Sequence, residues 1–381
     1  MKKYSMFVFY YIVGIVSALA LSAYPLIYNA KGYNEKMVAL LISISFIAVV
    51  FQPVIGYITD KFTTTLTMTK IIFVGYIISC FVMFISFKLF IIGLIINTIT
   101  RSSVIPLIDG YVTQNPELFP FSYAKMRTAM PIGFGTSFIV SLIFINVFGL
   151  PISGILVLLG ILAIVALIIV FSIKDVQKLN DKKSTKVQEN IVVKNDMLAI
   201  ITLFLFFILY AGAYQISSTY LTTYYTNFGY SGMFMSVLNF LMIIPQIFLM
   251  FNYDKLLGKF KKSTIQILAL SFGLLQVLIY VLFPHSVLLL VIAIMLSGIQ
   301  IVLFPASFYP QITKAIKSSY LSTGLTLLVT IQALWIGLYN QGFVAKVYAN
   351  TNNIKSIYLI MFGTILVSLI PVLIYRFKRE K

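Results

Sequence analysis

The sequence is poor in the side chains from which soluble enzymes build their sites. Its 381 residues include 10 acidic residues, a single cysteine, Cys80, and a single histidine, His285. One cysteine cannot form an intramolecular disulfide, and the sequence has no cluster of histidine, cysteine and acidic residues to hold a metal ion. A glycine-rich phosphate loop and a nucleophile paired with a base are also missing. We therefore expect neither an enzyme nor an ATP-driven pump, and no metal or cofactor.

Charged residues of both signs are scarce as well. They make up 10% of the chain, against 60% for hydrophobic residues, and the mean hydropathy is +1.00. Soluble domains are roughly a quarter charged, and their interiors are too small to hide this much apolar surface. The composition therefore indicates an integral membrane protein that is surrounded by the lipid bilayer.

Apolar stretches long enough to cross a bilayer follow one another, separated by short polar breaks. They are continuously apolar, which is typical of transmembrane helices and not of the alternating strands of a membrane barrel. The first stretch extends to Tyr28, too long for a secretory signal peptide, so we expect an uncleaved helix. We predict an all-α membrane protein of about twelve spans, near residues 5–28, 37–58, 70–87, 89–112, 125–148, 151–173, 197–225, 232–252, 264–283, 287–309, 321–344 and 355–375.

The positive charge is distributed unevenly between the predicted loops. Of 28 lysines and arginines, 22 fall in the loops on the side of the N-terminus and five in the loops on the other side. Cytoplasmic loops carry such an excess, so we predict a multi-pass protein of the cell membrane with both termini in the cytoplasm. The net charge of +18 does not indicate a nucleic acid partner, because it lies between apolar spans.

The longest polar segment lies between the sixth and seventh predicted spans, and we interpret it as a cytoplasmic linker. A faint repeat also divides the chain, because Asp60-Lys61 follows the second span and Asp254-Lys255 follows the eighth, 194 positions later. Duplicated halves are common in transporters, with the solute site between them near the bilayer midplane. The predicted organisation is a six-helix half, a linker and a second six-helix half, at 1–173, 174–196 and 197–381.

The loop after the second span has the pattern Gly56-x-x-x-Asp60-Lys61. Together with the layout of six spans, a basic linker and six spans, this loop resembles the signature of the major facilitator superfamily between helices two and three. The resemblance implies a role in cytoplasmic gating, in which the glycine lets helix ends approach and the aspartate caps a helix N-terminus. The basic end of the signature is absent here, where Thr63-Thr64-Thr65 stands instead.

A narrower resemblance concerns the fourth and fifth spans. Pro106-Leu107-Ile108-Asp109, then Tyr123-Ala124-Lys125-Met126-Arg127 and Gly133-Phe134-Gly135, is similar to the corresponding region of lactose permease and its phenylpropionate- and nucleoside-transporting relatives. In those proteins the acid and the arginine help to bind substrate, which implies substrate-binding roles for Asp109 and Arg127. We also expect these two side chains to meet across neighbouring helices.

The second half departs from that pattern. The relatives place an acid, an arginine and often a histidine on helices eight, nine and ten, where this chain has Gln246, Gln276 and, as the nearest polar residue on helix ten, Gln300. The second half is thus expected to lack charge inside the membrane, which weakens the case for proton coupling by the lactose-permease route. If a proton is coupled, Asp109 is the best-placed acid to carry it.

Arg101 stands near the middle of the fourth predicted span. A charge at the bilayer centre costs at least ~2.5–3.5 kcal/mol on insertion scales, so it needs a partner or a wet cavity. Two interpretations stay open: a contact to substrate or anion, or to Asp109, and a structural arginine bound by carbonyl groups. Asp109 lies eight residues on, ~12 Å along a straight helix, so the two side chains share a broad face without touching.

The seventh predicted span is unusually polar and includes Tyr214 and Gln215. Such groups suit the hydroxyls of a sugar or nucleoside, and a tyrosine adds a stacking face. Hydrogen bonding between helices is the competing interpretation. With Gln246, Gln276 and Gln300 they are the substrate-binding candidates of the second half.

We predict a secondary active transporter that moves a small polar solute, such as a sugar or nucleoside, by alternating access. We expect a monomer whose partners are that solute, a proton if one is coupled, and the bilayer. The alternatives are an exporter of drugs or metabolites and a flippase of lipid-linked oligosaccharides.

Overall fold

The computed structural model of the protein describes residues 4–30, 48–85, 87–142, 154–173, 175 and 197–379. The start of the second predicted span, the end of the fifth, the start of the sixth and all of the predicted linker except Asp175 lie outside these residues. The described chain is helical and contains no strand, and eight of its helices are long and apolar enough to cross a membrane. This agrees with the all-α membrane protein predicted from the sequence.

The described helices of the first half follow the predicted spans closely. The largest difference is a break at Thr128 that divides the fifth predicted span. The helices are α1 (Ser5–Ala30), η1 (Val49–Phe51), α3 (Gln52–Phe62), α4 (Thr65–Ile85), α5 (Phe87–Gln114), η2 (Pro116–Leu118), α6 (Tyr123–Arg127), α7 (Ala129–Leu142) and α8 (Gly154–Ser172).

The later helices also match, with two differences. The tenth predicted span continues six residues further, to Ala315, and the eleventh ends in a π-helix, η5. The helices are α10 (Met197–Asn227), α11 (Gly232–Phe251), α12 (Tyr253–Leu257), α13 (Lys262–Leu282), α14 (Val287–Ala315), η4 (Ser318–Tyr320), α15 (Leu321–Ile336), η5 (Gly337–Val344), α16 (Ala345–Thr351) and α17 (Ile354–Arg379).

By their contacts the residues form two compact units, which are described separately. Unit 1 comprises Met1–Lys194 with Lys317–Thr330, and unit 2 comprises Asn195–Ile316 with Ile331–Lys381. The sequence-based division placed Lys317–Thr330 in the second half. This segment groups with unit 1 because the start of α15 bonds to α3, and because Thr330 donates a hydrogen bond to the Val49 carbonyl at 3.1 Å. The division into two six-helix halves stays a prediction.

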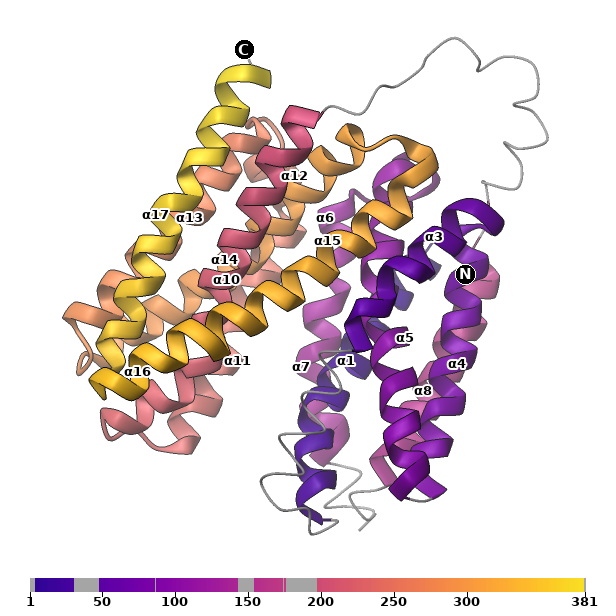
Figure 1. The fold of residues 1–381 in the computed structure, drawn as a ribbon, viewed down its shortest axis with the longest axis horizontal. Helices are drawn as coiled ribbons and strands as arrows, with labels where there is room; N and C mark the ends of the chain where they lie inside the picture. The colour runs from indigo at the N-terminus through magenta and orange to yellow at the C-terminus, as the bar shows by residue number, and fades with distance from the viewer. Residues whose placement is uncertain are drawn as a thin grey trace. The chain divides into compact units, whose positions relative to one another are not determined.

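In unit 1, α1 packs against α7 and α8, and α4 packs against α5 and α8 (Figure 1). Two glycines let α1 and α7 approach closely. A Cβ on Gly14 would lie 2.2 Å from the Met130 carbonyl oxygen, and one on Gly133 would lie 2.1 Å from the Tyr11 carbonyl oxygen. Small residues are what permit such contact between membrane helices, and this packing fixes α1 beside the site described below.

In unit 2, α13 packs against α14 and α17, α10 against α17, and α11 against α14. Much of its core is aromatic. The rings of Tyr210 and Phe304 stack with their centroids 4.5 Å apart, and the centroids of Tyr224, Tyr280 and Tyr358 lie 4.9 to 5.0 Å from one another. Aromatic packing of this kind joins α10 to α13, α14 and α17 and holds the polar side chains of α10 in fixed positions.

Candidate functional site

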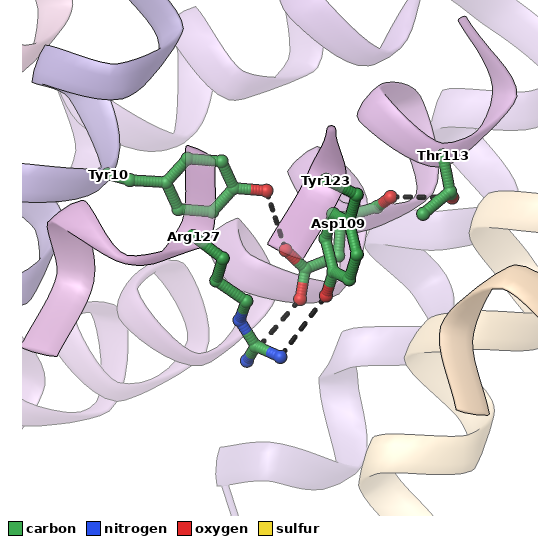
Figure 2. Close-up of polar contacts among 5 residues, drawn as sticks. All are labelled: Tyr10, Asp109, Thr113, Tyr123 and Arg127. Carbon is green, nitrogen blue, oxygen red and sulfur yellow. Dashed lines mark hydrogen bonds and ion pairs between the residues drawn. The ribbon is translucent and has the colours of Figure 1, made fainter. Parts of the chain in front are cut away.

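The main cluster of charge in unit 1 joins α5 to α6. An oxygen of Asp109 lies 3.5 Å from the guanidinium of Arg127, as the sequence predicts, and the Asp109 side chain is completely buried while that of Arg127 is 15% exposed (Figure 2). The second Asp109 oxygen accepts a hydrogen bond of 2.6 Å from the hydroxyl of Tyr10 on α1. A buried carboxylate is tolerable only with such partners.

Local structure brings the arginine to the acid. The chain turns through η2 between α5 and α6, and Arg127 stands at the end of the short helix α6. It donates a hydrogen bond of 3.1 Å to the hydroxyl of Tyr123, one helical turn earlier. At the same end of α5, Thr113 donates to the Asp109 carbonyl at 2.7 Å. The carboxylate and the guanidinium are therefore held from three helices.

The pair is not saturated by hydrogen bonds. At 3.5 Å, the contact from Arg127 is longer than a charge-assisted hydrogen bond. The Asp109 oxygen that faces Arg127 meets the geometric criteria for no hydrogen bond, although the Tyr123 hydroxyl lies beside the carboxylate and interacts with it. A donor group of a solute can reach this oxygen only after neighbouring side chains move, because the oxygen is shielded from solvent.

Arg101 belongs to a different part of unit 1. It stands in the middle of α5 and is partly exposed. It lines a small hollow with room for about one water molecule, together with Ser17 on α1 and Tyr76 on α4. Phe73 and three valines form the apolar wall. The structure thus brings Asp109 and Arg127 together and keeps Arg101 apart from both.

The predicted gating residues lie at the end of α3. Asp60 accepts hydrogen bonds from the backbone N–H groups of Ser322 at 3.0 Å and Thr323 at 2.7 Å, and from the Thr323 hydroxyl at 2.7 Å. These groups open α15, so the carboxylate caps that helix where its dipole favours negative charge. A Cβ on Gly56 would lie 2.1 Å from Thr326 Oγ1, which explains the glycine.

The remaining residues of this loop have different roles. Lys61 is exposed and donates to the Tyr57 hydroxyl at 2.9 Å. Thr64, in the stretch that lacks the usual basic residues, accepts a hydrogen bond from the Thr67 N–H and donates to the carboxylate of Asp175. The Thr64 hydroxyl therefore caps the start of α4 and links that helix to Asp175, which follows α8.

In unit 2, Tyr214 and Gln215 lie on α10 and are half-buried. The Tyr214 ring stacks on that of Tyr210 at 6.3 Å between centroids, and Gln215 donates to Thr219 at 3.3 Å. Gln246 on α11 is buried and donates to the Met242 carbonyl of its own helix at 3.2 Å. No hydrogen bond joins these three side chains to one another in the described part of unit 2, and the Tyr214 hydroxyl interacts with Ser297 of α14.

Gln276 and Gln300 form a buried hydrogen-bonded pair. Gln300 donates to Gln276 at 2.7 Å, and Gln276 donates to Ser217 at 3.1 Å, so the pair joins α14, α13 and α10. Both glutamines are at most 1% exposed. In this state their amides are used for contacts between helices, which is the competing interpretation that the sequence left open.

Tyr10 and Gln52 were missed by sequence reasoning, whereas Asn340 is one of the polar candidates that the sequence offers in the second half. Tyr10 is one of many tyrosines, and nothing in the sequence pairs it with Asp109. The amide groups of Gln52 and Asn340 are buried without a hydrogen-bond partner among the described residues, and Asn340 lies in the π-helix η5. Local irregularity of this kind is frequent at functional sites, but no sequence pattern announces it. No group of three potential metal ligands occurs in the described chain.

Comparison with known proteins adds solved structures that share the fold. A variant of the nucleoside transporter NupG is 16% identical with a TM-score of 0.64, covering 98% of this chain and 99% of that one. The proton:xylose symporter XylE is 13% identical with a TM-score of 0.71, covering 100% and 96%. A bacterial homologue of the iron transporter ferroportin is 14% identical with a TM-score of 0.74, covering 98% of each chain.

These identities are low, so the likeness concerns the fold alone. The predicted all-α membrane fold of the major facilitator type is confirmed. No curated protein sequence matches the chain significantly. The family model described as Major Facilitator Superfamily matches residues 6–340, which is most of the chain, and the protein therefore belongs to the Major Facilitator Superfamily.

Proposed function

We propose that this protein is a secondary active transporter of the cell membrane that moves a small polar solute, sugar- or nucleoside-like, by alternating access. The observation that carries the proposal is the contact of the buried Asp109 with Arg127, 3.5 Å apart, inside a chain of the Major Facilitator Superfamily. Ionisable groups within membrane spans are costly, and they mark solute or ion pathways more often than not.

In this proposal the solute is bound by Arg101, Asp109 and Arg127 of unit 1 and by polar groups of unit 2. The Asp109 oxygen that faces Arg127 offers an acceptor for a solute hydroxyl. Among the unit 2 groups, Tyr214 and Gln215 are half-buried and Gln246 is buried. Gln276 and Gln300 can bind the solute only when their mutual hydrogen bond opens.

The solute class is supported by the fold neighbours and by residue chemistry. The neighbours include proteins named as a nucleoside transporter and a xylose symporter. Tyrosine rings and side-chain amides are the groups that bind sugar hydroxyls and nucleobase edges. We propose that Gly56, Asp60 and Lys61 gate the cytoplasmic side, through the bonds of Asp60 to the start of α15. The charge bias of the loops supports cytoplasmic termini.

If transport is coupled to a proton, we propose that Asp109 is the group that carries it. It is the acid buried within the spans of unit 1, and both a tyrosine hydroxyl and an arginine contact its carboxylate. Replacing Asp109 by Asn removes the titrating group and keeps the shape. We expect Asp109→Asn to abolish concentrative uptake driven by a pH gradient in proteoliposomes while equilibrium exchange continues. Uptake that stays concentrative and pH-driven in this variant excludes the role.

The transport proposal is tested with purified protein. Thermal-shift screening against neutral sugars, nucleosides, aromatic acids and large apolar cations should give stabilisation by members of the first three groups, and the same compounds should be taken up by proteoliposomes. Binding and uptake of large apolar cations alone would replace the proposal by that of a drug exporter.

A further inference from the structure

We propose that unit 2 binds the headgroup of an anionic phospholipid at the end of the unit where α13 begins and where α14 and α17 end. The inference goes beyond the proposed transport function and does not depend on the identity of the solute. Under the predicted topology this end meets the cytoplasmic leaflet of the bilayer. The binding surface, here called the basic end of unit 2, carries Lys259, Lys261, Lys262, Lys314, Arg376 and Lys378.

The packing of α13 against α14 brings lysines from both helices to this end. The two helices run antiparallel, and Gln266 of α13 donates a hydrogen bond of 2.6 Å to Gln311 of α14. Lys262 stands four residues before Gln266, and Lys314 stands three residues after Gln311. Both lysines therefore lie about one helical turn beyond this bond, in the same direction.

The helix α17 returns to the same end. A Cβ on Gly273 of α13 would lie 3.1 Å from Ile365 of α17. Seven residues further along α13, the ring of Tyr280 lies 5.0 Å from that of Tyr358, which stands seven residues before Ile365. The two helices are thus antiparallel. Because α13 begins eleven residues before Gly273 and Arg376 stands eleven residues after Ile365, Arg376 lies at the end of unit 2 where α13 begins.

The charge at this end is strongly positive. Among the described residues that adjoin the six basic side chains there is one acid, Asp254 of α12. Asp254, Lys261 and Lys262 have polar contacts of their own, but one acid compensates at most one of six positive charges. The side chains at the ends of the surface are exposed to the surroundings, namely those of Lys259, Lys314, Arg376 and Lys378.

The start of α13 adds to this positive charge. Its N-cap residue is Lys261, whose side chain makes no capping bond, and its first turn contains no acid. The positive end of the helix dipole therefore lies beside the lysines, whereas the start of α15 is capped by the carboxylate of Asp60. Lys262 donates to the Tyr253 hydroxyl at 3.3 Å, and its ammonium lies 5.1 Å from the centroid of that ring. At least one of the charges is thus held in place.

Apolar side chains beside the cations indicate that the anion belongs to a lipid. Phe260 and Phe377 each stand between two of the basic residues in the sequence, and their rings are 49% and 64% exposed. A phospholipid brings acyl chains to cover such rings next to its charged headgroup, which a soluble phosphate compound cannot do. Basic residues at the ends of membrane helices attract anionic headgroups in this way.

The test measures lipid binding to the purified protein in a neutral detergent by native mass spectrometry. Phosphatidylglycerol is compared with phosphatidylcholine of the same acyl chains, so that the two lipids differ in the charge of the headgroup. We expect phosphatidylglycerol to bind the wild-type protein at least five-fold more tightly. The double variant Lys259→Gln with Arg376→Gln should lose most of this preference, because it removes one exposed cation from each side of the surface.

A matched control separates position from net charge. Lys346 of α16 and Lys355 at the start of α17 lie away from the basic end, so Lys346→Gln with Lys355→Gln removes the same formal charge and should keep the preference. Should the first double variant fail to fold, Lys314→Gln with Lys378→Gln replaces it. Equal binding of the two lipids by the wild type, or an equal loss in the test and control variants, overturns the inference. Displacement of phosphatidylglycerol by an equal concentration of inorganic phosphate also overturns it.

Discussion

The hydroxyl of Tyr10 donates a hydrogen bond of 2.6 Å to the carboxylate of Asp109, a residue 99 positions later in the chain. Both side chains are completely buried. The bond joins α1 to α5 at the place where α5 also meets Arg127 of α6. The Tyr10 hydroxyl is thus a structural partner of the ion pair, because its hydrogen bond stabilises the buried carboxylate of Asp109.

Removing this hydroxyl should destabilise the protein. In Tyr10→Phe the carboxylate loses its donor without a change of packing, and an unsatisfied buried acceptor costs about 1–3 kcal/mol. We expect a lower melting temperature in detergent. Tyr11→Phe is the control, because Tyr11 is adjacent and its hydroxyl makes no hydrogen bond with the described residues. Equal melting temperatures for the two variants would contradict the assigned role.

The Asp109–Arg127 pair should behave as one unit. Arg127→Gln leaves a buried carboxylate without its counter-charge, for which losses of about 3–5 kcal/mol are typical. Asp109→Asn should cost less, because Arg127 is partly exposed and can hydrate. The double variant should be more stable than the sum of the single losses predicts. A double-mutant cycle on thermal stability measures this coupling, and strict additivity would mean that the 3.5 Å contact contributes nothing.

Asp60 should stabilise the start of α15. Its carboxylate accepts from the N–H groups of Ser322 and Thr323, and losing such a cap costs about 0.5–2 kcal/mol. Asp60→Ala should therefore lower thermal stability and, under the gating proposal, change the rate of uptake. Glu117→Ala removes an exposed acid of the short helix η2 and should change neither. If both variants have the same melting temperature, the Asp60 cap makes no net contribution to stability.

Two glycines that differ in surroundings allow a direct test of helix packing. A Cβ on Gly133 would lie 2.1 Å from the Tyr11 carbonyl oxygen, whereas one on Gly363 of α17 meets nothing within 4 Å. Gly133→Ala should separate α1 from α7 and reduce the yield of folded protein. Gly363→Ala should be neutral or should stabilise α17 by about 0.5–1 kcal/mol, since alanine favours helix over glycine. Size-exclusion profiles and melting curves of the two variants give the comparison.

Much of the architecture can be predicted from the residues alone. Long apolar stretches cross a bilayer as helices, because backbone N–H and C=O groups without hydrogen bonds are too costly in lipid. The scarcity of acids singled out Asp109. The resemblance of the fourth and fifth spans to lactose permease and its relatives paired it with Arg127, and the structure confirms their contact at 3.5 Å. These properties depend on composition and on short motifs, which the sequence contains directly.

Partners that are distant in the chain were decided only by the tertiary structure. The bond between Tyr10 and Asp109, the capping of α15 by Asp60 and the pairing of Gln276 with Gln300 depend on which faces of helices meet. In lipid every helix face is apolar, so the hydropathy pattern cannot say which face is buried against protein. The sequence determined that this protein crosses the membrane as helices and keeps few charges there. Only helix packing decided that Tyr10 joins the Asp109–Arg127 pair and that Arg101 lines a separate hollow.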